Sequence, residues 1–244
     1  RLMRLSGQAE VTPHVDVNYY WRERVRVHVP IVTQPSVRFT CGDAEINMAA
    51  GECWIFDTWR LHRVVNDHSA ARIHLVADTV GGRGFWPLLR QARPHDRAIP
   101  GWQPQHVAPD ASAPTALEVE TCNVPTVMSP WEVREHLGFL FGETPPSEAL
   151  RALGQAVMGP FTREWHALWA KHGDGGGGFD EYRALRDQVR PHLARFEALS
   201  MRNGLSLVEG IRVVILGNLV AGSVDGDVET RDTPRANATA GAGP

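Results

Sequence analysis

The chain has 244 residues, enough for one large domain or two smaller ones, and its 43% hydrophobic and 22% charged content is ordinary for a globular protein. Its net charge of −3 gives no reason to expect nucleic acid or an anionic membrane as partner, and no apolar run could span a bilayer. Cys41, Cys53 and Cys122 cannot all pair and lack zinc spacing, so we expect a reducing, cytoplasmic compartment. Because the chain begins at Arg1, we also expect its N-terminus to be incomplete.

The first 80 residues are typical of β-structure. Short runs rich in Val, Ile, Phe and Thr are separated by turn signals and predict strands at 1–5, 24–32, 37–40, 52–57 and 72–80. Many short strands at this spacing favour an antiparallel sandwich or barrel.

After residue 80 the pattern changes twice. Loop composition extends to about residue 128, with one or two helical turns expected within "FWPLLRQA". Ser129 then resembles an N-cap with Pro130 at the first helical position, and helical periodicity continues, with a break or kink near Gly159 and Pro160. We therefore divide the chain into a sheet domain (1–90), an irregular connection (91–128), a helical region that could support a homodimer (129–221) and a disordered tail (222–244).

Two strands share a pattern of polar residues. In "RVRVHVPIV" the side chains of Arg26 and His28 lie on one face, opposite a row of valines, and in "RIHLVADTV" Arg72 and His74 do the same. A polar face turned to solvent is the ordinary interpretation of such strands, and a core role is equally open for His74. The other histidines, including His136, have no partner pattern and are expected at the surface.

A histidine and a carboxylate in an extended segment can bind one metal ion. His14 and Asp16 are separated by one residue, so their side chains project from the same side, and His62 is placed to supply a third ligand. Two histidines and one carboxylate form the facial triad of non-haem Fe(II) oxygenases, which leaves positions open for a 2-oxo acid and O₂. The distal carboxylate of such an acid needs a cation, and Arg72 can supply a planar guanidinium.

In this order and spacing, "PHVD", "RVRVHVPIVT", "GECWIFDTWRLHRVVN" and "RIHLVADT" resemble the aspartyl/asparaginyl β-hydroxylase family of Fe(II)/2-oxoglutarate dioxygenases. The resemblance covers about residues 1–80. It implies an α+β protein: a double-stranded β-helix (a jelly-roll, cupin-like barrel) followed by a helical C-terminal region. Asp16 makes the chain more similar to the bacterial proline-hydroxylase branch, because the peptide hydroxylases of this family bind iron with two histidines.

The resemblance also implies roles for individual residues. His14, Asp16 and His62 match the catalytic iron ligands, Arg72 matches the arginine that pairs with the far carboxylate of 2-oxoglutarate, and Arg26 with His28 match a motif near the other end of this cosubstrate. The implied reaction is hydroxylation of an unactivated C–H bond of an amino acid, free or within a peptide, most plausibly Pro, Asp or Asn. Succinate and CO₂ would be released.

Two other classes remain open. A cupin-like metal enzyme that does not use 2-oxoglutarate predicts that Arg72 can be replaced without loss of activity. A non-catalytic β-helix module for binding or regulation predicts that the chain holds no stoichiometric iron.

Overall fold

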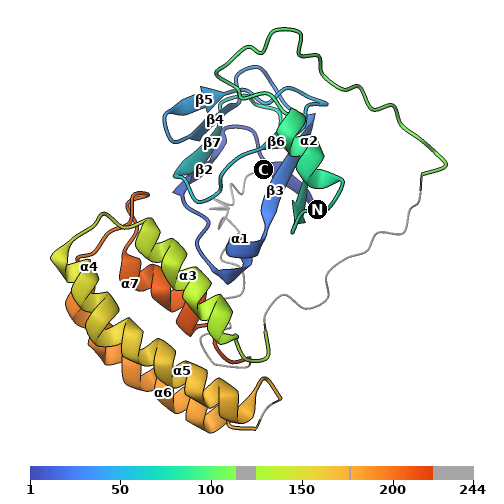
Figure 1. The fold of residues 1–244 in the computed structure, drawn as a ribbon. Helices are drawn as coiled ribbons and strands as arrows, with labels where there is room; N and C mark the ends of the chain where they lie inside the picture. The colour runs from blue at the N-terminus through green and yellow to red at the C-terminus, as the bar shows by residue number, and fades with distance from the viewer. Residues whose placement is uncertain (114–124, 176, 222–244) are drawn as a thin grey trace, which may run out of the picture.

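The computed structural model describes residues 1–113, 125–175 and 177–221 and shows an α+β fold, with strands in the first third of the chain and helices in the last half (Figure 1). Two four-stranded antiparallel sheets are formed, in the orders β1-β8-β3-β6 and β2-β7-β4-β5. The strands are β1 (Leu2–Leu5), β2 (Ala9–His14), β3 (Val25–Val32), β4 (Arg38–Cys41), β5 (Ala44–Ile46), β6 (Trp54–Ile55), β7 (His62–Asn66) and β8 (Arg72–Thr79).

Some of the helices begin where the sequence supplies a side-chain cap. Ser129 caps α3 with a complete capping box, in which Glu132 accepts from the backbone N–H of Ser129, and Pro130 opens the helix. The described helical elements are α1 (Tyr19–Glu23), α2 (Phe85–Gln91), α3 (Pro130–Gly142), α4 (Glu148–Leu153), α5 (Gly159–His172), α6 (Phe179–Leu193), α7 (Leu207–Gly210), π-helical η1 (Gly154–Met158) and η3 (Ile211–Leu216), and 3₁₀-helical η2 (Ala194–Phe196). No described helix has the length and apolar run needed to cross a membrane.

Near Gly159 and Pro160, where a break or kink was expected, the α-helix is interrupted by a π-helical turn but the chain stays helical. The chain passes from α4 through η1 into α5 as one continuous helical segment, in which the N–H of Gly159 bonds the carbonyl of Gly154, five residues back. A π-helical turn widens the backbone spiral, so it accommodates a proline that cannot donate a hydrogen bond. The predicted tail at 222–244 lies outside the described residues.

The polar faces of β3 and β8 point inward, which corrects the ordinary interpretation of these strands. Arg26 and His28 are 7% and 8% exposed and Arg72 is 6% exposed, whereas Leu75 on the opposite face is 43% exposed. The apolar cluster between the sheets is small and is centred on Val37, Phe39, Met48 and Val64. The interior of the sheet part is thus built around polar side chains.

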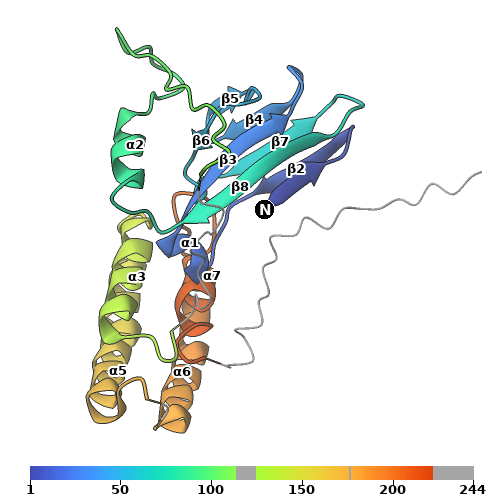
Figure 2. The ribbon, with the colours of Figure 1, turned by 90° about the vertical axis from the view of Figure 1, so that its right-hand side faces the viewer.

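The helical part has a larger apolar core, and two residues of the sheet part belong to it. Tyr19 on α1 and Trp59 from the β6–β7 loop pack into the core formed by α3–α7. The Tyr19 hydroxyl donates to Glu132 at 3.0 Å, and the side-chain amide of Asn203 donates to the carbonyl of Trp59 at 3.1 Å. Figures 1 and 2 show α1 at this junction, beside α3 and α7. These contacts join the two parts of the chain.

His136 on α3 is buried at this junction, contrary to the expectation that it lies on the surface. It is 1% exposed, its ring meets Tyr19 edge-on at 5.4 Å, and neither ring nitrogen has a hydrogen-bond partner among the described residues. Burial, reinforced by the charge of Arg22, lowers the pKa of His136 to about 4. The ring is therefore neutral at pH 7.

Replacing His136 with leucine should stabilise the protein and reduce its sensitivity to acid. In the unfolded chain this histidine binds a proton below its ordinary pKa of about 6.5, whereas in the folded chain it does so only below about 4. The free energy of unfolding therefore decreases as the pH falls from about 6.5 to about 4. His136→Leu should remove up to about 1.4 kcal/mol of this loss per pH unit. The free energy of unfolding in urea, measured at pH 7 and pH 5, tests this prediction. His192→Leu, on the exposed face of α6, is the control. If wild type and His136→Leu lose the same free energy of unfolding between these two pH values, the prediction is contradicted.

Candidate metal centre

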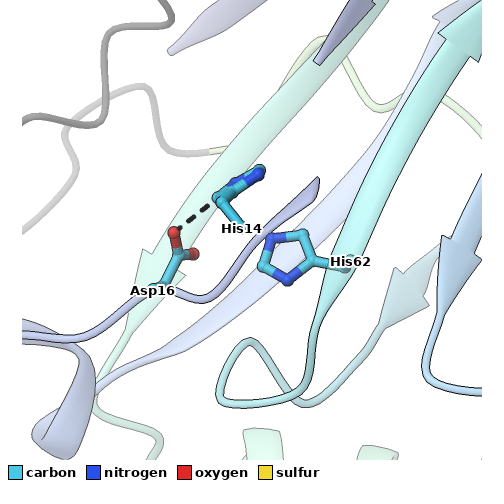
Figure 3. Close-up of side chains that lie close together, drawn as sticks. All are labelled: His14, Asp16 and His62. Atoms are coloured by element: carbon cyan, nitrogen blue, oxygen red, sulfur yellow. Dashed lines mark ion pairs between the residues drawn. The ribbon is translucent and has the colours of Figure 1, made fainter. Parts of the chain in front are cut away.

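Three side chains meet where β2 and β7 lie side by side. His14 ends β2 and is the register partner of His62, the first residue of β7, while Asp16 follows two residues after His14. One donor atom from each residue lies within 4.8 Å of the others, and Figure 3 shows the three side chains converging. Asp16 and His62 are buried, and the side chain of His14 is 39% exposed. The structure thus brings together the three residues singled out in the sequence.

Backbone contacts fix the orientation of both imidazoles in the same way. Nδ1 of His14 lies 2.7 Å from the carbonyl of Thr12, and Nδ1 of His62 lies 2.8 Å from the carbonyl of Arg60. Because a carbonyl can only accept, each Nδ1 carries a proton, and in the neutral ring the lone pair is then on Nε2. In this tautomer Nε2 can bind a metal, and a hydrogen bond from the second nitrogen is typical of metal-bound histidine.

The carboxylate of Asp16 is held between two partners. Its Oδ1 is 3.8 Å from Nε2 of His14, and its Oδ2 is 3.7 Å from Nη1 of Arg26. The backbone N–H of Asp16 donates to the carbonyl of Thr58, which ties the loop after β2 to the loop before β7. Such a carboxylate faces a cation on one side and can offer an oxygen to a metal on the other.

Arg26 and His28, the other predicted cosubstrate residues, lie on the inner face of β3 but in different surroundings. Arg26 donates to Asp78 at 2.9 Å through Nε and stacks on Trp21, 4.0 Å from the ring centre. The ring of His28 lies 5.4 Å from that of Phe56, which in turn is 5.1 Å from the ring of His62. Arg26 therefore contacts the cluster directly, and His28 is linked to it through an aromatic side chain.

Arg72 is a buried guanidinium without a counter-ion. No carboxylate lies within 4.0 Å of it among the described residues, its Nε has no partner, and Nη2 donates to Nδ1 of His74 at 2.9 Å. Burial lowers the pKa of Arg72 to about 10, so the group is still charged at pH 7. An uncompensated buried charge is costly, so the Arg72 guanidinium is suited to pairing with an anion.

His74 is a residue whose role sequence reasoning missed. Its Nδ1 accepts from Arg72 and lies 3.3 Å from Nδ1 of His28, so His28 must be the donor in that contact. Burial lowers the pKa of both imidazoles to about 3, so both stay neutral. The signal was present in the sequence, since His74 shares a strand face with Arg72 as His28 does with Arg26.

Removing one histidine of the cluster should abolish tight metal binding. His62→Ala should lower the affinity for Fe(II) by at least about 100-fold. Loss of a residue that only hydrogen-bonds to a metal ligand already lowers metal affinity by about 10–100-fold, and loss of the ligand itself should have a larger effect. Anaerobic equilibrium dialysis followed by metal analysis gives the stoichiometry, and His68→Ala, an exposed histidine beside the same sheet, should bind as wild type. Substoichiometric Fe(II) in wild type, or full binding by His62→Ala, would contradict the assignment.

Comparison with known proteins points to one family. Residues 1–81 match the family model described as aspartyl/asparaginyl beta-hydroxylase. Among solved structures, the TT1209 protein from Thermus thermophilus is 19% identical over 32% of this chain and 68% of its own, with a TM-score of 0.26. A predicted oxalate decarboxylase from Thermotoga maritima is 14% identical over 32% of this chain and 61% of its own, also with a TM-score of 0.26. Structural similarities with TM-scores this low do not support a conclusion about function. Among curated proteins, none matches this chain. The matched segment holds all three residues of the cluster, and the family that it matches is the one that the sequence resemblance predicted.

Proposed function

We propose that the protein is an Fe(II)- and 2-oxoglutarate-dependent dioxygenase that hydroxylates an unactivated C–H bond of an amino acid, free or within a peptide. The observation that carries the proposal is the donor set itself. Two imidazoles in the ligating tautomer and one buried carboxylate meet within 4.8 Å, which fits the two-histidine, one-carboxylate triad that binds non-haem iron.

The sheet topology supports a double-stranded β-helix around this site. Along the chain the eight strands are distributed between two antiparallel sheets so that β1, β8, β3 and β6 share one and β2, β7, β4 and β5 the other. Eight strands in two facing sheets are typical of a jelly roll, in which a site is enclosed by the inner faces. The inward polar side chains of β3, β7 and β8 agree with this arrangement.

Arg72 supports 2-oxoglutarate as the cosubstrate. A guanidinium that is 6% exposed and lacks a carboxylate partner among the described residues would gain a charge-assisted, bidentate contact from the far carboxylate of a dicarboxylic oxo acid. His74 holds Nη2 of Arg72 and thereby fixes the plane of the guanidinium. Arg72 would therefore bind the cosubstrate, and His74 would act as a positioning residue.

The chain's own residues would provide binding, orientation and exclusion of water. His14, Asp16 and His62 would hold the iron, which supplies the activation of O₂ when bound. The carbonyls of Thr12 and Arg60 keep both imidazoles in the ligating tautomer, and Phe56 shields one side of His62. Asp16 is the residue that separates this site from the family's two-histidine members.

Replacing Arg72 with methionine should raise the KM for 2-oxoglutarate by at least about tenfold, since a hydrogen bond to a charged group contributes roughly 1.5–3 kcal/mol. The same substitution removes an uncompensated buried charge, so the metal-free variant should unfold at no lower temperature than wild type. Succinate release at varied 2-oxoglutarate concentrations measures the first effect, and Arg38→Met, at an exposed arginine of β4, is the control.

These assays separate the proposal from the two other classes. Turnover of a candidate amino acid that persists without 2-oxoglutarate, or is unchanged in Arg72→Met, would favour a metal enzyme of another kind. Failure of wild type to hold iron would favour a binding or regulatory module. Free proline, aspartate and asparagine, each tested for O₂-dependent succinate release, are the first substrates to try.

A further inference from the structure

A cavity of about 210 Å³ lies at the junction between the sheet part and the helical part. Its walls come from three separate regions of the chain: the α1–β3 segment, the β6–β7 loop, and α3. The residues that matter here are Trp21, Arg22, Arg26, Phe56, Trp59 and Phe139. The helical part therefore contributes directly to the wall of this cavity.

The cavity borders the metal cluster. Arg26 lines it and lies 3.7 Å from the carboxylate of Asp16, and Phe56 lines it with its ring 5.1 Å from that of His62. Thr58, also in the wall, accepts the backbone N–H of Asp16. The side chains of Arg26 and Phe56 would thus lie between a molecule in the cavity and two of the candidate ligands, Asp16 and His62.

Arg22 enters this cavity as a cation with unused hydrogen-bond donors. Its guanidinium stacks on the ring of Phe139, 3.5 Å from the ring centre. Within the described part of the chain it has no carboxylate within 4.0 Å, and its buried Nε has no acceptor. Stacking fixes the plane of the group but leaves its edge, where the N–H donors lie, available for a planar anion.

Two indoles add further donors without acceptors. Trp21 and Trp59 are 7% and 9% exposed, both line the cavity, and the Nε1 of each is buried with no partner among the described residues. A buried N–H without an acceptor is costly, so an oxygen atom brought within reach of either indole would stabilise this wall. The rings themselves offer flat apolar surface.

The size of the cavity restricts what can fill it. At roughly 30 Å³ per water molecule it has room for a small organic acid, and it falls below the roughly 300–1,000 Å³ of pockets for drug-sized ligands. The wall also contains two acidic residues, Asp57 and Glu143, which would attract a positive group on the same molecule.

We infer that this cavity binds the carboxylate of a small substrate, with Arg22 as its anchor and Phe139 of the helical part as the residue that holds the anchor in place. Arg22 is thus a specificity-determining residue, and Phe139 a positioning residue. The inference rests on the proposed function only in calling the bound acid a substrate. It assigns to the helical part a role in substrate selection.

Calorimetry on the whole chain, without iron or 2-oxoglutarate, tests the inference with matched acids and amides. The probes are L-proline against L-prolinamide and benzoate against benzamide. Wild type should bind at least one acid about tenfold or more tightly than its amide, as expected for a hydrogen-bonded charged group. Arg22→Gln should bind acid and amide alike. Arg183→Gln, which alters an arginine stacked on Phe179 of α6 at 5.3 Å, should retain the wild-type preference.

The outcomes are distinguishable. If wild type prefers neither acid, or if Arg22→Gln keeps the preference, the inference is overturned. Should Arg22→Gln fail to fold, Phe139→Leu replaces it and should weaken acid binding several-fold without affecting the amide; unchanged acid binding overturns the inference. A wild type that prefers the acid but never consumes 2-oxoglutarate refutes the proposed function alone. One that consumes 2-oxoglutarate but shows no acid preference refutes this inference alone.

Discussion

The pairing of β2 with β7 is the constraint on which the site depends. Their antiparallel register sets His14 opposite His62, and a bulge between Val11 and His14 adjusts the end of β2. Because side chains alternate along a strand, a slip of one residue would turn either histidine to the other face. Asp16 joins the pair since the loop after β2 is tied to Thr58 by a backbone hydrogen bond.

Burial of polar side chains in the sheet part costs free energy, which the apolar core of the helical part can offset. Between the sheets lie Arg26, His28, Arg72 and His74, all buried, beside a small apolar cluster. Buried polar groups stabilise a fold only when fully paired, and Arg72 is not. The helical core, which includes fully buried residues such as Trp165, Leu193 and Ile215, also encloses Tyr19 and Trp59 from the sheet part. It is typical of functional proteins that residues at a site reduce stability locally and that packing elsewhere in the fold compensates for this loss.

Sequence patterns predicted the residues of the metal cluster better than they predicted the strands and helices that position these residues. The strands β1, β3, β4 and β8 were expected from their apolar and β-branched residues, whereas β2 was not, because its alternating pattern is short and is interrupted by Pro13. The five-residue α1 was also missed, since so short a helix is held by packing at the junction rather than by propensity. His14, Asp16, His62 and Arg72 could be singled out because spacing and residue type are local properties. The cavity could not, because its walls come from segments that are far apart in the chain, such as α1 and α3.

The central claim is that one metal ion binds His14, Asp16 and His62 while a 2-oxo dicarboxylate reaches Arg72. A crystal structure of the chain with Mn(II) in place of iron and an unreactive analogue of 2-oxoglutarate tests it most directly. The account predicts an anomalous-scattering peak within ligand distance of all three side chains and the far carboxylate of the analogue paired with Arg72. A metal bound elsewhere, or an analogue whose far carboxylate does not contact Arg72, would contradict it.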